Sequence, residues 1–184
     1  MPRLALPSLA LLALTSLPLH AHDHFHQHNA AAHQHGIGHL DLVVEGEQLL
    51  LELNLPAADL LGFEHAPRTA EQHQQVDALR EQLQQARELF GLPAAAQCSL
   101  DSVQLDSSLF AEAAHSGDDA HSEHAHADIS ARYQFSCAAP QQLRQLEVLL
   151  FEQFPGSETL LLQAITPAGQ QGGELNADNH RVRL

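Results

Sequence analysis

Histidine is the residue with the clearest chemical potential in this sequence, and most of its copies lie in two clusters. The first is HDHFHQHNAAAHQHGIGH, residues 22–39, which places seven histidines within eighteen residues. The second is AEAAHSGDDAHSEHAHAD, residues 111–128, which interleaves four histidines with aspartates and glutamates. Neutral imidazole is a ligand for zinc, copper and nickel, and unlike thiolate it survives an oxidising compartment. The two clusters therefore predict metal binding outside the cytoplasm.

The composition between the histidines predicts segments that wrap around an ion. Alanine, glutamine and asparagine predict a mobile segment at 22–36, and the lack of large apolar residues predicts a surface loop at 111–128. Zinc takes three or four protein ligands, so the eleven clustered histidines would serve about two to four ions. The alternative is a solubilising low-complexity tract with incidental metal affinity. The candidate ligands are His22, His24, His26, His28, His33, His35, His39, His115, His121, His124, His126, Asp118, Asp119, Glu123 and, outside the clusters, His65.

The first cluster follows a stretch typical of an export signal. Residues 1–21 combine Arg3 with a leucine- and alanine-rich run that ends at Ala21, which predicts a cleaved signal peptide; an uncleaved membrane anchor is the alternative. An expression tag would not lie between such a signal and its domain. Cleavage after Ala21 would leave the amino terminus His22-Asp23-His24, whose amine, backbone nitrogens and second imidazole would suit square-planar Cu(II) or Ni(II).

Charge and motifs restrict the class of function. The mature chain would have 184 − 21 = 163 residues and a formal charge of 7 − 23 = −16, because Arg3 is lost and no acidic residue precedes residue 22. That sign argues against nucleic acid and anionic lipid as partners. The chain contains no nucleophile elbow, P-loop or HExxH motif, and its candidate ligands lie on predicted loops. We therefore predict that it is not an enzyme and is not inserted in a membrane after cleavage.

The two cysteines, Cys98 and Cys137, predict a disulfide, since an even cysteine count in an exported chain favours one. Both lie in predicted strands, and the alternation after Cys98 slips by one residue near Leu100, which suggests a bulge. If these strands pair antiparallel, the bridge closes a loop of about 40 residues and contributes roughly 4 kcal/mol through loop-closure entropy. A redox-active or metal-binding pair is the alternative, although no CxxC spacing occurs.

The remaining sequence predicts regular structure with mostly antiparallel sheet. Alternating leucines predict a hairpin over 38–55, and Thr69 caps a predicted helix over 69–90. A second helix is predicted over 140–154, followed by a hairpin with strands at 159–165 and 174–184. The order ββα-ββα-ββ indicates a single α+β domain at 37–184 and hints at an internal pseudo-repeat.

Three histidines outside the clusters have less distinctive settings. His73 lies near the apolar stripe of the predicted 69–90 helix and reads as a side chain at the helix rim. His180 reads as an ordinary strand residue. His65 belongs to PAADLLGFEHAP, residues 56–67, where Gly62 could end a short helical turn and Phe63 could dock in the core. There His65 is either part of a structural turn or a metal ligand.

This last motif carries a resemblance to a known family. The signal-like start, the HxHxH run that leads through HGIGHL into the first strand, and above all PAADLLGFEHAP resemble the ZrgA family of His-rich periplasmic zinc-binding proteins. The resemblance implies a periplasmic zinc-binding protein, expressed under zinc limitation, that assists a high-affinity zinc ABC importer or its periplasmic binding protein. It also implies that the loop histidines His115, His121, His124 and His126 are ligands.

The sequence therefore favours a periplasmic accessory protein that captures or buffers Zn(II), with more than one ion bound. Two alternatives stay open. One is a periplasmic copper or nickel chaperone. The other is an interaction protein that docks to a transporter and whose histidine segments only sense metal.

Overall fold

The fold begins with the hairpin that the leucine alternation predicts. In the computed structural model, which describes residues 34–110 and 127–184, β1 (Ile37–Glu45) and β2 (Gln48–Pro56) pair antiparallel across a tight turn. Gly46 in this turn has a φ of 57°, in the left-handed region that glycine enters without a side-chain clash. The alternate leucines of both strands are buried, and the residues between them are exposed or half-buried. The hairpin thus has one face for the core and one for solvent.

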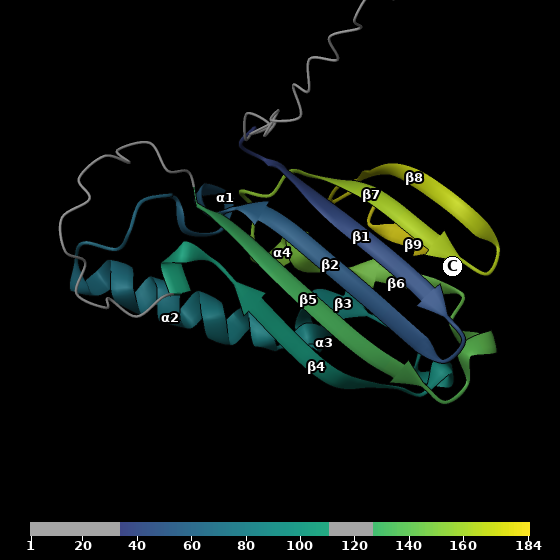
Figure 1. The fold of residues 1–184 in the computed structure, drawn as a ribbon. Coiled ribbons are helices and arrows are strands. Elements are labelled where there is room, and N and C mark those ends of the chain that lie inside the picture. Colours follow the sequence, from purple (N-terminus) through teal and green to yellow (C-terminus); the bar gives the residue numbers. More distant parts are fainter. Residues whose placement is uncertain (1–33, 111–126) are drawn as a thin grey trace, which may run out of the picture. The chain divides into compact units, whose positions relative to one another are not determined.

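The hairpin lies in the middle of a six-stranded sheet with the order β4-β5-β2-β1-β7-β8 (Figure 1). The β1–β7 pair is parallel, and the other four pairs are antiparallel. One face of this sheet is buried; the opposite face, called the outer face below, is exposed or half-buried. The other strands are β4 (Cys98–Asp106), β5 (Asp128–Cys137), β7 (Thr159–Thr166) and β8 (Gly169–Leu175).

Helices and a small three-stranded sheet, in the order β3-β6-β9, cover the buried face. Tyr133 of β5 is fully buried there; its hydroxyl donates to the Leu83 carbonyl at 2.9 Å, and its ring meets Phe90 edge-on at 5.2 Å. These contacts join the two layers around one apolar core. The covering elements are α1 (Ala57–Leu61), α2 (Ala70–Gln84), α3 (Ala86–Leu89), α4 (Leu150–Gln153), β3 (Phe90–Gly91), β6 (Gln145–Val148), β9 (Arg181–Arg183) and three 3-10 turns (Ala94–Ala96, Ser108–Phe110 and Pro140–Gln142).

The helix predicted over 69–90 is confirmed in part. Thr69 caps α2 as expected, because its Oγ1 accepts the Gln72 N–H at 3.2 Å. The helix is interrupted at Gln85, whose ψ of 64° is not helical, and continues as the short α3. This break turns the chain so that Phe90 leaves the helical stripe and enters β3. The predicted stripe is nevertheless buried along its whole length.

The helix predicted over 140–154 is wrong. Its middle forms β6, which pairs with β3 and β9, and only one helical turn, α4, follows. Leu146 and Val148 are buried while Glu147 between them points outward, so the same leucine spacing also satisfies the two-residue period of a strand. Pairing on both sides decides between the two patterns, and sequence periodicity does not contain that information.

The final hairpin is also different from its prediction. The Pro/Gly/Gln stretch that was expected to be a loop forms a two-residue turn at 167–168 and then β8, which pairs with β7 along its whole length. The predicted strand 174–184 is split: β8 ends at Leu175, and β9 joins the small sheet instead. Gly169–Gly173 carries no strand signal in its composition, but an edge strand needs only backbone hydrogen bonds to its neighbour.

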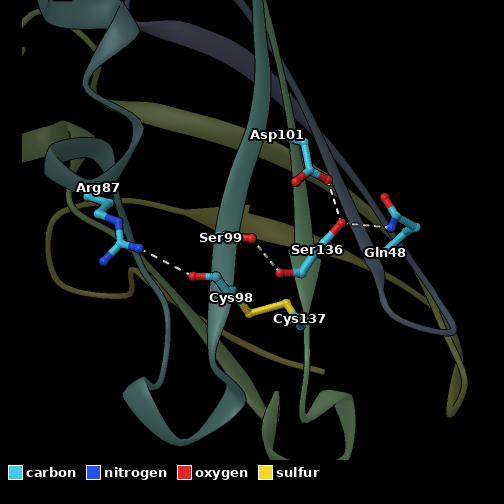
Figure 2. The surroundings of a disulfide bond; sticks show 7 residues. All are labelled: Gln48, Arg87, Cys98, Ser99, Asp101, Ser136 and Cys137. Carbon is cyan, nitrogen blue, oxygen red and sulfur yellow. Dashed lines mark hydrogen bonds between the residues drawn. A yellow bond between two sulfur atoms is a disulfide. The ribbon is translucent and has the colours of Figure 1, made fainter.

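The predicted disulfide between Cys98 and Cys137 is confirmed, and so is the bulge. β4 and β5 pair antiparallel with the two cysteines directly opposite each other, and the register shifts between Leu100 and Ser102. Figure 2 shows the bridge beneath a group of polar contacts, in which the Ser136 hydroxyl donates to Asp101 at 2.5 Å. The bridge ties edge strand β4 to the sheet at the end remote from residues 111–126.

The fold class is therefore α+β with mostly antiparallel sheet, as predicted. The described residues belong to one compact unit, Ala32–Leu184. The ββα-ββα-ββ order and the pseudo-repeat are not confirmed, because the second unit has a strand and a single helical turn where a counterpart of α2 was expected.

Candidate metal centre

Both histidine-rich segments meet the described fold at α1. At the amino-terminal side, the Gly36 N–H donates to both carboxylate oxygens of Asp59, at 2.9 and 3.0 Å. At the other, the Ala127 carbonyl, at the end of residues 111–126, accepts the Ala57 N–H at 2.9 Å. Asp59 and Ala57 both belong to this five-residue helix. The starts of β1 and β5 thus lie beside the same helix (Figure 1).

Gly36 is held on two sides. Its carbonyl accepts the N–H groups of Glu158 and Thr159, at 2.9 and 2.8 Å, while its own N–H binds Asp59. Its φ is 81°, and a Cβ added there would lie 3.3 Å from the Glu158 side chain. Glycine is required by both the backbone conformation and the space. This clasp fixes His35, the residue just before it, against the end of the sheet.

Asp59 is a buried carboxylate in negatively charged surroundings. Only 8% of the residue is exposed, and burial raises the pKa of its carboxyl; Glu158 and Glu64 raise that pKa further. The Gly36 N–H and the nearby His35 act in the opposite direction on the same pKa. Three carboxylates and one imidazole are therefore close enough to influence one another. A cation near His35 would lower the cost of holding these carboxylates together.

His35 makes the contact that is most relevant to a metal. Its Nε2 lies 2.5 Å from Oε1 of Glu64, whose side chain is only 17% exposed. Imidazole nitrogen and carboxylate oxygen are both zinc ligands, so this pair supplies two of the three or four that zinc takes. Among the described residues, no group of three or more His, Cys, Asp or Glu side chains is arranged to hold a metal ion. His35 and Glu64 form half of a site.

His65 is next to Glu64 and is part of a structural turn. Its ring stacks on Phe63, with centroids 5.3 Å apart and planes at 26°, and Phe63 packs against the core. Its Nδ1 lies 2.9 Å from the Ala66 carbonyl, so a proton on Nδ1 leaves a lone pair on the exposed Nε2. Gly62 ends α1 with a φ of 79°, as predicted for this motif. The turn therefore positions the ring and leaves one nitrogen available to an ion.

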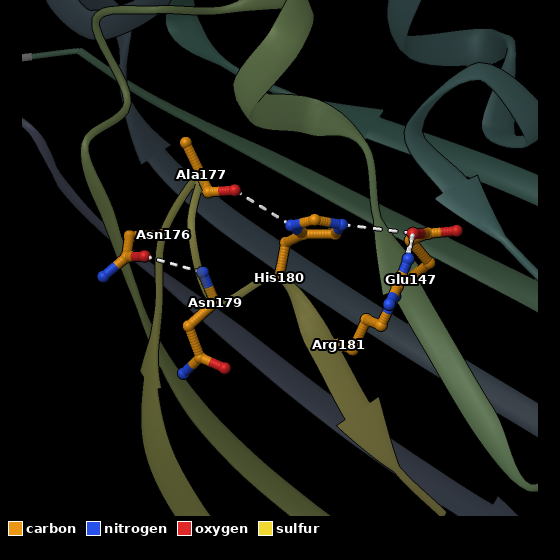
Figure 3. A network of polar contacts seen from close by, with 6 residues as sticks. All are labelled: Glu147, Asn176, Ala177, Asn179, His180 and Arg181. Atoms are coloured by element: carbon orange, nitrogen blue, oxygen red, sulfur yellow. Dashed lines mark hydrogen bonds and ion pairs between the residues drawn. The ribbon is translucent and has the colours of Figure 1, made fainter.

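The remaining described histidines have no carboxylate positioned to share an ion or are already engaged. His39 is exposed on the outer face of β1, opposite Asn54 and Leu161, and His73 is exposed on α2. His180 lies just before β9 and makes two contacts: Nδ1 is 2.9 Å from the Ala177 carbonyl, and Nε2 is 3.1 Å from Glu147 Oε1 (Figure 3).

The His180 contacts are part of an ion-pair network that secures the small sheet. Arg181 donates to the same Glu147 oxygen through Nε and Nη2, at 3.1 and 3.0 Å. Arg181 and His180 together lower the pKa of the Glu147 carboxyl. Sequence reasoning did not find this network, because Glu147 lies 33 residues from His180 and inside a stretch predicted as helix.

Sequence reasoning also passed over Asp59 and Glu64, although both stand in the PAADLLGFEHAP motif that it singled out. The other candidate ligands lie outside the described residues, and their roles stay predictions. The same holds for the Cu(II) or Ni(II) site at the amino terminus. These residues are His22, His24, His26, His28, His33, His115, His121, His124, His126, Asp118, Asp119 and Glu123.

Comparison with known proteins identifies the family. A sequence profile described as "ZrgA family zinc uptake protein" matches residues 32–184, which include α1, both cysteines and the second histidine cluster. No curated protein matches the chain. The match concerns zinc uptake and is not to a known enzyme family. In residues 34–110 and 127–184, no helix has the length and apolar character needed to cross a bilayer.

Proposed function

The chain belongs to the ZrgA family of zinc uptake proteins, and we propose that it is a periplasmic zinc-binding accessory protein. In this proposal it captures or buffers Zn(II) through its histidine-rich segments and assists a high-affinity zinc ABC importer or that importer's periplasmic binding protein. The family match carries the proposal. The disulfide supports an exported location, because such bonds persist in oxidising compartments.

The arrangement at α1 supports a division of labour. The folded body would fix the root of each histidine-rich segment, through Gly36–Asp59 and Ala127–Ala57. The segments would supply most of the ligands, and His35 with Glu64 would add a pair already held by the fold. A segment that must be ordered around an ion binds less tightly than a preformed pocket, so an anchored pair reduces that cost.

The negative charge of the chain is suited to this role. With 23 acidic and 8 basic residues it carries a formal charge of −15, which raises the local concentration of cations. Asp59, Glu64 and Glu158 place part of that charge beside His35. The first protein group that an arriving ion meets would then be the carboxylate-rich end of the sheet.

A competitive zinc titration against a chromophoric chelator tests the proposal. The mature protein is compared with a variant lacking 22–33 and one lacking 112–126; both deletions leave the anchoring contacts at Gly36 and Ala127 in place. We expect two or more zinc ions at submicromolar affinity, with the larger loss in the 112–126 deletion. Copper or nickel outcompeting zinc in the intact protein, or micromolar binding that scales only with histidine number, would contradict it.

A further inference from the structure

The two edges of the six-stranded sheet are protected to different degrees. The β4 edge has a bulge between Leu100 and Ser102 and carries Asp101 and Asp106, and bulges and charges are devices that discourage strand addition. The β8 edge has neither over Gly169–Gly173, whose sequence GQQGG contains no charge and no proline. These residues are exposed, and β8 pairs with β7 alone. The β8 edge is thus open to a further strand.

A groove on the outer face runs beside this edge. It has a volume of about 540 Å³ and crosses β1, β7 and β8, where Asp41, Val43, Ile165 and Gly172 are among its lining residues. Ile165 is 51% exposed, more than any other large apolar residue in the described part of the chain. Gly172 lacks a side chain that would close the groove from the edge. An added strand could therefore lay a large side chain across Gly172 onto Ile165.

These observations also define the chemistry of the occupant. A large apolar or aromatic side chain opposite a strand glycine covers the exposed sheet and compensates for the missing side chain. The groove contains the Asp41 carboxylate, and the whole chain carries −15, so acidic residues in the occupant are disfavoured. A second copy of this chain fits poorly, because the outward residues of its β8 are Gln170, Gly172 and Glu174, none of which is apolar.

We propose that the β8 edge is a docking site for an extended segment of a partner protein. The segment adds a strand to β8, is neutral or basic, and places an aromatic or large aliphatic residue over Gly172. Backbone hydrogen bonds supply part of the affinity, and the groove supplies the selectivity, as in other strand-addition complexes. The Asn179 amide already donates to the Glu174 carbonyl at 3.0 Å, so the open part of the edge ends before Glu174.

The test uses the full mature chain and a synthetic probe. The chain contains no tryptophan, so a blocked heptapeptide with a central tryptophan, flanking threonines and arginine at each end gives a fluorescence signal without background. We expect a blue shift of the tryptophan emission on binding, and backbone amide shifts in NMR spectra confined to β8 and its neighbours on β7. The interface is small, so the binding will be weak and transient.

Matched variants and peptides separate strand addition from non-specific contact. Gly172→Val fills the groove with a strand-favouring side chain and is expected to abolish the blue shift, whereas Gln104→Val on the β4 edge should leave it unchanged. Ile165→Ser should weaken binding about tenfold through the loss of apolar contact. A peptide N-methylated at alternate amides cannot pair with β8 and should not bind. Thermal unfolding of each variant confirms that it is folded.

Three results would overturn the proposal. One is equal binding of the N-methylated peptide, which would mean contact without strand pairing. Another is amide shifts centred away from β8. The third is sedimentation showing that the chain alone associates through this edge, which Gly172→Val suppresses; a second copy would then be the occupant.

Discussion

The molecule contains two histidine–glutamate contacts, and their surroundings give them different properties. At the α1 junction, His35 meets Glu64 beside the buried Asp59, and Asp59 has Glu158 as a further acidic neighbour. At the small sheet, His180 meets Glu147 beside an arginine. The residue types in the pair are the same, and the neighbouring charges have opposite sign. The pKa directions follow: the pKa of Asp59 is raised, and that of Glu147 is lowered.

The contrast identifies what makes such a pair suitable for a metal. At Glu147 the arginine already neutralises the carboxylate, and the two nitrogens of His180 already face a carbonyl and a carboxylate. A cation entering there would meet a positive neighbour and would have to break both histidine contacts. At His35 the excess charge is negative, so an ion would relieve repulsion among carboxylates. The first pair is a half-site; the second stabilises the fold.

The largest effect that would test this comparison is expected at Asp59. Replacing it with alanine removes the acceptor of the Gly36 N–H in a buried position, and an unsatisfied buried donor costs about 1–3 kcal/mol of unfolding free energy. Chemical denaturation followed by circular dichroism measures the change. Asp59→Asn retains an acceptor and should recover part of the loss. Equal stability of wild type and Asp59→Ala would mean that the clasp does not anchor β1.

A smaller effect is expected on zinc affinity, and it separates the two pairs directly. His35→Gln in the full chain should weaken the tightest zinc ion about tenfold, a change of about 1.4 kcal/mol in binding free energy, because one ligand held by the fold is lost. His180→Gln is the matched control and should leave zinc affinity unchanged. Competition with a chelator under the same conditions measures both. If both variants lose affinity equally, the neighbouring charges do not distinguish the pairs.

Sequence reasoning predicted the parts of the fold that depend on local pattern. The leucine alternation defined the first hairpin, the slip after Cys98 indicated the bulge at Leu100, and Gly62 ended α1 as expected. Each of these follows from the side-chain period of a strand or the backbone freedom of glycine. The region over 140–154 failed because Leu146 and Val148 satisfy two periods at once, and only pairing with β3 and β9 selects the strand.

The candidate site was predictable in part for a related reason. Imidazole-rich composition and the GFEHAP motif drew attention to His35 and His65. The partners of His35 could not be read from the sequence, since Glu64 lies 29 residues away and meets it only after α1 has folded back beside β1. Asp59 was hidden for the opposite reason: it stands in a short helix next to leucines, where an acidic residue reads as solvent-exposed until the Gly36 contact is known.

The smallest expected effect is a difference in the sign of pH dependence. The Glu147 pKa is lowered in the folded state, so its contribution to stability is present above its unfolded pKa and is lost as pH falls through the folded value. Asp59 has the opposite sign, because its raised pKa makes its contribution decline as pH rises from the unfolded value through the folded one. Glu147→Gln should therefore flatten the loss of stability in acid, and Asp59→Asn should steepen it.

Denaturation midpoints measured across the acid range, in the absence of metal, give both slopes. Glu52→Gln, which removes the exposed partner of Arg132 on the outer face, controls for the loss of a surface carboxylate. If Glu147→Gln and Asp59→Asn change the slope in the same direction, then Arg181 and the carboxylates around His35 do not create the opposite electrostatic environments that distinguish the two pairs. Opposite slopes would assign the cation-attracting environment to the α1 junction independently of any metal titration.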